Sequence, residues 1–478
     1  MDQYLHRVGG EWVGGSGTVP DVNPSDTREV VGEAAQADAP LVAAATRAAR
    51  DAADEWAHSG PQQRFEVLDA AGAQVLARRA ELGRLLASEE GKPIAEATAE
   101  VARAGQILKY FAGEALRQTG DLLPSVRPGL SVEVTREPVG VVGLVTPWNF
   151  PIAIPAWKVA PALAFGNTVV LKPSELVPGC ATELVRILVD AGLPDGVLNL
   201  VHGSGAEVGG ALVSSPDVDA VSFTGSVATG RSIAAACVPD GRKVQLEMGG
   251  KNPLVVLDDA DLDVAVSAAV NGAYFSTGQR CTASSRLVVT EGVHDAFVER
   301  LAERVRGLRV GHALAPDTVV GPVVDERQLR KDLDYLAIAA QEGGEVLGGD
   351  QVERDTPGWY LSPALVTGTT GDMRINREEV FGPVASVVRV ADYDAALAEA
   401  NATEFGLSAG VVTTSLRYAK HFARHARAGM VMVNAPTAGV DPHVPFGGSR
   451  ASSYGPREQG AYAREFYTTV KTTYVDPG

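Results

Sequence analysis

The chain has 478 residues, of which 45% are hydrophobic and 21% are charged, as is usual for a globular protein. This length exceeds one typical domain, so we expect two or three folding units. The net charge of −17 argues against nucleic acid or an anionic membrane as a partner. Three cysteines cannot form a disulfide framework and are typical of a reducing compartment, so a cytoplasmic protein is expected.

The N-terminal region shows patterns for packing rather than chemistry. No basic-then-apolar signal pattern opens it, and nowhere does an apolar run approach the roughly 20 residues that span a bilayer. Apolar residues at helical spacing predict helices over about 40–57, 61–90 and 95–116. Residues 121–137 change in character, because Ser131-Val-Glu-Val-Thr135 alternates like a strand that needs a partner. An ordinary surface hairpin is the alternative there.

Residues 138–248 repeat a strand-then-helix pattern. The short strands are almost continuously apolar, which predicts a parallel sheet covered on both faces by helices. Ligands of such sheets bind at the carboxyl ends of strands. We expect the strands at 139–145, 168–171, 198–201, 220–223 and 244–246.

Three of these strand ends carry residues suited to a ligand. The third of these ends, at Gly225 and Ser226, is followed by the start of a helix, whose free backbone N–H groups suit a phosphate. Gly225 and Gly230 are five apart, so this is not a G-x-G-x-x-G motif. Alone, these features also fit a solvated ion pair and a simple turn with a cap. The residues are Trp148 and Asn149, Lys172 and Glu175, and Gly225 and Ser226.

Residues 248–445 form a second strand–helix unit around a cysteine loop. Cys281 follows a helical run at 264–273 and precedes a predicted strand at 286–290. A thiol becomes nucleophilic as a thiolate, which a nearby cation or free N–H groups favour; a small buried apolar residue is the alternative. His421 and His425 lie four apart without the Glu of H-E-x-x-H, so we expect a surface helix and no metal. Cys180 and Cys237 are expected to be buried.

Six strings resemble motifs of the aldehyde dehydrogenases, in that family's order and over essentially the whole chain. The resemblance implies an α/β fold with two doubly wound domains, a Rossmann-like cofactor domain (1–120 and 138–248) and a catalytic domain (249–448). It also implies a β oligomerisation arm (121–137 and 462–478) that pairs with a neighbouring subunit, in a homodimer or homotetramer. The strings are Pro147-Trp-Asn-Phe-Pro151, Leu171-Lys-Pro-Ser-Glu175, Phe223-Thr-Gly-Ser226, Leu246-Glu-Met-Gly-Gly-Lys251, Tyr274 to Ala283 and Glu379-Val-Phe-Gly-Pro383.

The same resemblance implies roles for individual residues. Cys281 attacks the aldehyde carbon, Asn149 and the Cys281 N–H hold the oxyanion, and Glu247 is the base for thioester hydrolysis. Without the resemblance, Glu247 could equally be a surface carboxylate. Glu175 favours NAD because a carboxylate repels a 2′-phosphate, while Lys172 would tolerate NADP. The implied cofactor residues are Trp148, Lys172, Glu175, Gly225, Ser226, Glu379 and Phe381.

The strings around 279–286, 436–448 and 453–460 look most like the subgroup that oxidises 2-oxoglutarate semialdehyde (2,5-dioxopentanoate). Arg280 could pair with a carboxylate of such a substrate, or form a structural ion pair. Pro442 and the string 448–451 depart from the subgroup, which leaves succinate semialdehyde or a phosphono-aldehyde open. A CoA-acylating enzyme, disfavoured by Glu247, and a non-catalytic binding protein are the other interpretations. The expected apolar walls are Phe150, Trp157 and Phe446.

Overall fold

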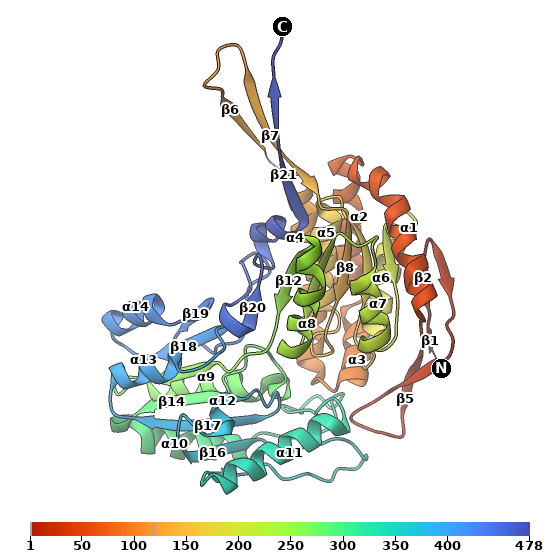
Figure 1. The fold of residues 1–478 in the computed structure, drawn as a ribbon. Coiled ribbons are helices and arrows are strands. Elements are labelled where there is room, and N and C mark those ends of the chain that lie inside the picture. The colour runs from red at the N-terminus through yellow and green to blue at the C-terminus, as the bar shows by residue number, and fades with distance from the viewer. Residues whose placement is uncertain (1, 118–119) are drawn as a thin grey trace.

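The computed structural model describes residues 2–117 and 120–478. Two open sheets carry helices on their faces, and a narrow arm projects from the first sheet (Figure 1). The predicted α/β class is therefore confirmed. Within the described residues, none of the helices combines the length and apolar character that a membrane crossing requires.

The first sheet has eight strands, and its central five run parallel. Both β20 and β2 join it antiparallel. The edge strand β20 comes from the C-terminal segment, which lies outside the ranges predicted for the cofactor domain. The boundaries of that domain stay a prediction. In spatial order the strands are β20 (Ser453–Tyr454), β12 (Lys243–Glu247), β11 (Ala220–Thr224), β8 (Val141–Val145), β9 (Thr168–Lys172), β10 (Leu198–Leu200), β2 (His6–Val8) and β3 (Glu11–Val13).

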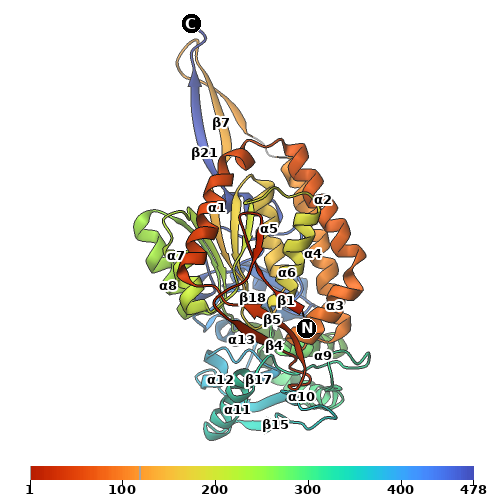
Figure 2. The ribbon, with the colours of Figure 1, turned by 90° about the vertical axis from the view of Figure 1, so that its right-hand side faces the viewer.

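Helices cover both faces of this sheet, as Figure 2 shows. One face packs against α2 (Pro61–Ala77), α3 (Arg79–Glu90), α4 (Ile94–Ala115), α5 (Ala153–Ala164) and α6 (Pro178–Asp190). The other packs against α1 (Ala39–Ala57), α7 (Gly210–Ser214) and α8 (Val227–Cys237). Every residue of α5 is buried, because this helix lies between the sheet and α4.

The second sheet has seven strands, all parallel except the first. In order they are β15 (Glu345–Leu347), β16 (Ala364–Thr369), β17 (Val384–Val390), β14 (Arg286–Thr290), β13 (Pro253–Val256), β18 (Ser408–Val412) and β19 (Met430–Val433). One face packs against α9 (Leu262–Tyr274) and α10 (Glu291–Arg306). The other packs against α13 (Tyr393–Asn401) and α14 (Leu416–His425), and α11 (Glu326–Gln341) with α12 (Arg374–Arg377) lies near β16.

The arm is a three-stranded antiparallel sheet that includes the C-terminal tail. Strand β7 (Ser131–Pro138) pairs on one side with β6 (Asp121–Pro124) and on the other with β21 (Thr468–Val475), which follows the short helix α15 (Arg464–Tyr467). A small sheet at the other end of the chain joins β1 (Asp2–Tyr4), β5 (Val30–Ala35) and β4 (Thr18–Val22). The arm leaves several large apolar side chains exposed, namely Leu122, Leu123, Val126, Val470 and Tyr474.

Two features differ from the sequence predictions. The helix expected over 61–90 breaks at Arg78, whose φ and ψ of −91° and 11° leave the helical range. Its guanidinium binds Glu81 at 2.6 Å and Glu183 at 2.7 Å, so one local and one long-range ion pair hold Arg78 at the break. The polar stretch after 311 holds a further helix, α11, whose start is capped by Asp325 accepting from the Gln328 N–H.

Candidate active site

Cys281 lies in a tightly folded loop that follows α9. The loop opens with a short 3₁₀ turn, η3 (Phe275–Gly278), in which Ser276 and Thr277 have φ angles of 52° and 55°. Such backbone is uncommon outside glycine and persists only where the surrounding packing enforces it. A Cβ atom at Gly278 would lie 2.1 Å from a carbonyl of the segment before β17. The loop is therefore pinned, and it holds the half-exposed thiol in a defined place.

The end of β12 brings Glu247 to this loop. Glu247 is the last residue of the strand, and glycines follow two and three residues later. A Cβ atom on Gly250 would lie 2.5 Å from the Cys281 carbonyl oxygen. That carbonyl accepts a hydrogen bond from Asn252 Nδ2 at 2.8 Å. Glycine at position 250 therefore lets the strand end approach the thiol loop closely.

Asn149 reaches the same loop from beyond the carboxyl end of β8. The Nδ2 atom of its side chain donates to the backbone carbonyl of Gln279 at 2.9 Å. The backbone carbonyl of Asn149 accepts from Lys92 Nζ at 2.6 Å. Lys92 is in turn ion-paired with Glu100 at 2.6 Å. An amide has two N–H donors, so the second can bind a negative oxygen that forms beside Cys281.

The thiol and its neighbouring carboxyl groups alter one another's ionisation. Burial, together with Glu379 and Glu247, raises the pKa of the Cys281 thiol to about 12. Burial and Glu458 raise the pKa of Glu247 well above its ordinary value, and a hydrogen bond from Ser453 opposes them. The resting site therefore holds a protonated thiol beside carboxyl groups of raised basicity.

Lys172 and Glu175 lie at the carboxyl end of β9 with Nζ and Oε2 3.2 Å apart. The Lys172 side chain is 3% exposed and that of Glu175 is 41% exposed, so only the carboxylate faces solvent. Burial opposes the ionisation of Glu175, but the charge and hydrogen bond of Lys172, a backbone hydrogen bond and the charge of Arg327 together lower the pKa of this carboxyl. An ionised carboxylate at a strand end suits the hydroxyl groups of a ribose.

The start of α8 lies against the end of β12. Ser226 is its N-cap, and the Oγ atom accepts from the Thr229 N–H at 3.3 Å. The Gly225 N–H donates to the Glu247 carbonyl at 3.0 Å. A Cβ atom on Gly225 would lie 2.5 Å from the Phe223 ring, so a larger residue would push this turn outward. The free N–H groups of the helix start thus suit the diphosphate of a dinucleotide.

Two aromatic rings, one from each of the two large sheets' segments, are in contact. Trp148 and Phe381 are arranged edge to face, with centroids 5.4 Å apart. Phe381 has a φ of 71°, a strained value for a bulky residue. Glu379, two residues earlier, accepts from the Gly250 N–H at 2.7 Å. Residues from both sheets therefore converge beside Cys281.

A pocket of about 300 Å³ contains Cys281 in its wall. All four residues predicted for the substrate side line it, namely Phe150, Trp157, Arg280 and Phe446. The Trp157 and Phe446 rings lie 5.5 Å apart, centroid to centroid. These rings form an apolar wall next to the thiol.

Two guanidinium groups line the pocket without an ion pair to any described carboxylate. Arg280 Nη2 donates to two carbonyls in the last turn of α9, one of them at 3.2 Å. Arg103 Nη2 donates to Gln459 Oε1 at 3.3 Å, and its guanidinium lies 5.9 Å from the Trp157 ring centroid. The Nε atoms of both are buried and make no hydrogen bond to any described residue. Burial lowers the pKa of both groups, although Glu100 and Asp441 oppose this effect at Arg103 and Glu96 opposes it at Arg280.

The carboxylates of the pocket already have partners. Glu100 binds Lys92 and accepts from two backbone N–H groups at the start of α5, at 3.2 and 3.3 Å. Glu96 accepts from the N–H and the hydroxyl of Ser276, at 3.1 and 2.5 Å. Three cations and two carboxylates line the cavity, so the net formal charge of its lining is positive.

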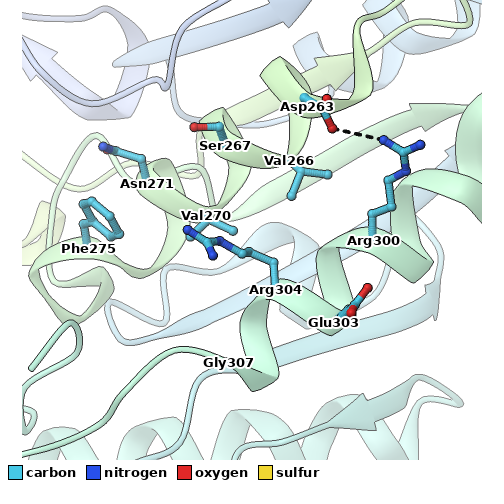
Figure 3. Close-up of a pocket in the computed structure, with 10 residues that line it drawn as sticks. All are labelled: Asp263, Val266, Ser267, Val270, Asn271, Phe275, Arg300, Glu303, Arg304 and Gly307. Carbon is cyan, nitrogen blue, oxygen red and sulfur yellow. Dashed lines mark hydrogen bonds and ion pairs between the residues drawn. The ribbon is translucent and has the colours of Figure 1, made fainter.

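A second depression, of about 630 Å³, lies on the outside of the second sheet between α9 and α10 (Figure 3). Asp263 and Arg300 face each other there at 3.1 Å. None of its ten lining residues is among those predicted for the site. Over residues 2–117 and 120–478, no group of three His, Cys, Asp or Glu side chains could hold a metal ion. On α14, His421 stacks on His425 and bonds to Tyr393 at 2.6 Å.

A sequence model of the aldehyde dehydrogenase family matches residues 12–473. The chain belongs to this family. A protein from Bacillus subtilis named alpha-ketoglutaric semialdehyde dehydrogenase is 42% identical over 482 residues, which cover 100% of this chain and 99% of the relative. A betaine aldehyde dehydrogenase from Cereibacter sphaeroides is 41% identical over 96% of this chain and 94% of its own length. The crystal structure of an NAD-dependent aldehyde dehydrogenase from Sinorhizobium meliloti has a TM-score of 0.97 and 39% identity, covering 100% of this chain and 95% of that one.

The predicted family and enzyme class are thereby confirmed: the chain is an NAD(P)-dependent aldehyde dehydrogenase. The related structure from Sinorhizobium meliloti is that of an NAD-dependent enzyme, which agrees with NAD as the predicted cofactor. Its structure brings Cys281, Asn149, Glu247 and Glu379 to one place, while their individual roles stay predictions.

Other residues of this aldehyde dehydrogenase site were missed. Sequence pattern predicts no chemistry for the helices of the N-terminal region, yet Lys92, Glu96 and Arg103 line the Cys281 pocket. Three charges of α4, at positions 96, 100 and 103, recur at helical spacing, which was a usable signal. Ser453 and Glu458 carried no such signal, because only the fold brings them to Glu247.

Proposed function

We propose that this aldehyde dehydrogenase oxidises a semialdehyde that carries a carboxylate, with 2-oxoglutarate semialdehyde as the substrate. The observation that supports this best is the pair of guanidinium groups, Arg103 and Arg280, that line the Cys281 pocket with no ion pair to a described carboxylate. A buried cation is costly unless an anion accompanies it. A guanidinium also matches a carboxylate in a two-pronged hydrogen bond. The Bacillus subtilis relative is named for this substrate.

Cys281 is the nucleophile in this proposal. Its thiol proton is lost to a neighbouring carboxylate and then to solvent, and the sulfur bonds to the aldehyde carbon while the C=O electron pair moves to oxygen. The second N–H of the Asn149 amide and the Cys281 backbone N–H stabilise that oxyanion. NAD, held by Glu175, the start of α8 and Glu379, would supply the hydride acceptor. Loss of hydride from this carbon re-forms the C=O bond and leaves the acyl group on Cys281 as a thioester. Glu247 then takes a proton from water, which attacks the thioester carbon and releases the Cys281 thiolate with the acid product.

The residues predicted for the cofactor fit NAD by their chemistry. Glu175 offers an ionised, half-exposed carboxylate for ribose hydroxyls, with Lys172 buried behind it. The turn at Gly225 and Ser226 presents the N-terminus of α8 for the diphosphate. Glu379, which accepts from the Gly250 N–H and acts electrostatically on Cys281, is the residue we propose for the second ribose.

Replacing Glu175 with glutamine is expected to shift cofactor preference toward NADP. The substitution removes a negative charge that would repel the 2′-phosphate and leaves Lys172 to attract it. We expect the ratio of kcat/KM for NAD to that for NADP to fall by about tenfold or more, a change of ~1.4 kcal/mol. Asp190→Asn, at the exposed end of α6, makes the same charge change elsewhere and should leave the ratio unaltered. An unchanged ratio in Glu175→Gln would remove Glu175 from the ribose site.

Of the two guanidinium groups, Arg103 is the stronger candidate for the substrate carboxylate. The Nη2 atom of Arg280 already donates hydrogen bonds to two carbonyls in the last turn of α9. Arg103 has a single long hydrogen bond to Gln459 and a buried Nε atom with no described partner. Arg103 therefore has more donors left for a ligand, and Arg280 adds positive potential close to the thiol.

Replacing Arg103 with methionine is expected to reduce kcat/KM for 2-oxoglutarate semialdehyde by roughly 10- to 100-fold, the scale of one charge-assisted pair. Most of the loss should appear in KM, because the charge binds the far end of the substrate rather than the reacting carbon. Pentanal, which has no carboxylate, should be oxidised at an unchanged rate. Lys109→Met, on the same helix but paired with Asp69 outside the pocket, is the matched control.

The test of the proposed function is a panel of aldehydes of similar length in an NADH assay of the unmodified enzyme. Acidic, neutral and quaternary-ammonium aldehydes separate the proposal from the specificity that the name of the Cereibacter sphaeroides relative indicates. Preference for the acidic aldehyde supports the proposal, and preference for betaine aldehyde would contradict it. The carboxylates of the pocket already accept hydrogen bonds, Glu100 from Lys92 and Glu96 from Ser276, which disfavours a cationic substrate.

The arm supports a homodimer or homotetramer as the working form. Val126 and Leu122 are 100% and 75% exposed in the single chain, and β6 is an edge strand of the arm. Exposed apolar residues on an open sheet edge are a usual sign of pairing with another chain. We also propose the cytoplasm as its compartment, because all three cysteines are free thiols.

A further inference from the structure

The carboxyl group of Glu247 has a specific neighbour on the edge strand of the first sheet. Strand β20 pairs antiparallel with β12, and Ser453 lies directly opposite Glu247. The Ser453 hydroxyl donates to Glu247 Oε2 at 2.5 Å. The two residues are 9% and 2% exposed, so water competes little for this hydrogen bond.

A second hydrogen bond helps to orient the Ser453 hydroxyl. The Gly448 N–H donates to Ser453 Oγ at 2.7 Å, so this oxygen accepts one hydrogen bond from the backbone. The single hydroxyl proton remains available to donate to Glu247 Oε2. The arrangement therefore stabilises the carboxylate form of Glu247, which is the form that can act as a base.

The space around the carboxylate is shaped to receive it. A Cβ atom on Gly447 would lie 2.6 Å from Glu247 Oε1, so a side chain at that position would displace the carboxylate. The charged and titratable groups that face it are Glu458 and Arg457 from the C-terminal segment, Lys158 from α5 and Cys281 from the thiol loop. Among these, Glu458 opposes ionisation and the two cations favour it.

We infer that Ser453 is a positioning residue for the base, holding the Glu247 carboxylate against β20 and setting the pH below which thioester hydrolysis fails. This inference rests on the proposed role of Glu247. Without the hydroxyl, the repulsion from Glu458 remains while one stabilising hydrogen bond is lost. Glu247 would then take up a proton at higher pH, and hydrolysis would slow there. Attack by Cys281 and hydride transfer do not use Ser453.

The test separates the two halves of the reaction. Rapid mixing measures the first burst of NADH, and the pH profile of steady-state turnover, under conditions where hydrolysis limits it, measures the second half. In Ser453→Ala, the pH at which turnover falls on the acidic side of the profile (the acidic limb) should rise by about one unit or more. This shift corresponds to the loss of a hydrogen bond to a charged group. The burst rate should not change. Ser453→Thr keeps the hydroxyl and should restore the original limb.

Two further variants protect the test from a loss of folding. Ser453→Cys keeps the volume with a weaker donor and should shift the limb in the same direction as alanine. Ser452→Ala removes the neighbouring buried hydroxyl, which accepts from the Gly406 N–H at 3.1 Å and does not contact Glu247. It should leave the limb in place.

The outcomes distinguish this inference from the base assignment. Full turnover in Glu247→Gln would overturn the role of Glu247 itself. A stalled Glu247→Gln together with an unmoved limb in Ser453→Ala and Ser453→Cys would overturn only the role of Ser453. An equal shift in Ser452→Ala would show a general disturbance of β20 and would also overturn it.

Discussion

Replacing Cys281 with alanine is expected to abolish aldehyde-dependent NADH formation, lowering kcat/KM by about 10⁴-fold or more. The substitution removes the only atom in the pocket placed to bond covalently to the aldehyde carbon in the proposed mechanism. NAD binding should persist, because Lys172, Glu175 and the start of α8 lie on the first sheet and are not altered. Calorimetric titration with NAD and an absorbance assay for NADH measure the two properties separately.

Cys237→Ala is the matched control for this experiment. Cys237 is a fully buried residue at the end of α8, and its replacement should leave the rate unchanged. Substantial aldehyde oxidation by Cys281→Ala would contradict covalent catalysis at this position. Loss of NAD binding as well would mean that the loop, rather than the sulfur alone, had been damaged.

Replacing Glu247 with glutamine is expected to leave the first hydride transfer intact and to block turnover. Glutamine keeps the shape of the side chain but cannot accept a proton from water, so the thioester on Cys281 should accumulate. We expect a burst of one NADH per active site, followed by a steady rate reduced by about 10²- to 10⁴-fold, the usual contribution of a general base. Stopped-flow absorbance gives the burst amplitude and the residual rate.

Mass spectrometry of the stalled enzyme adds an independent readout. The intact protein should gain the mass of the acyl group, located on the peptide that contains Cys281. Hydroxylamine, a strong external nucleophile, should release it and permit another burst. Full steady-state activity in Glu247→Gln, or a burst without an acyl adduct, would contradict the assignment of Glu247 as the base.

Local pattern was sufficient for most of the strands and for the thiol loop. The strands near 168–171, 220–223 and 286–290 occur within a residue or two of the predicted bounds, because short apolar runs between turns have few other ways to be buried. The sequence around Cys281 indicated a loop with tight geometry, and the positive φ angles at Ser276, Thr277 and Gly278 agree with it.

Long-range contacts account for what pattern could not show. The break at Arg78 depends on an ion pair with Glu183, 105 residues later. Arg103 lies on a helix for which sequence pattern predicts no chemistry, and only the approach of Gln459 and Trp157 makes it part of a pocket. Ser453 meets Glu247 across a sheet edge that no local signal announces.

The order of synthesis gives the edge strand β20 a consequence in the cell. Ser453 bonds to a residue made 206 positions earlier, and β21 completes the arm only after β20 has been made. Because synthesis runs from the N-terminus, one edge of β12 and one edge of β7 remain unpaired in the nascent chain until β20 and β21 have been made. Bare edges invite pairing with other chains. Premature termination near residue 450 would therefore yield a chain that includes the thiol loop and most core residues but lacks β20 and β21. Such a chain should be prone to aggregation and unable to complete thioester hydrolysis.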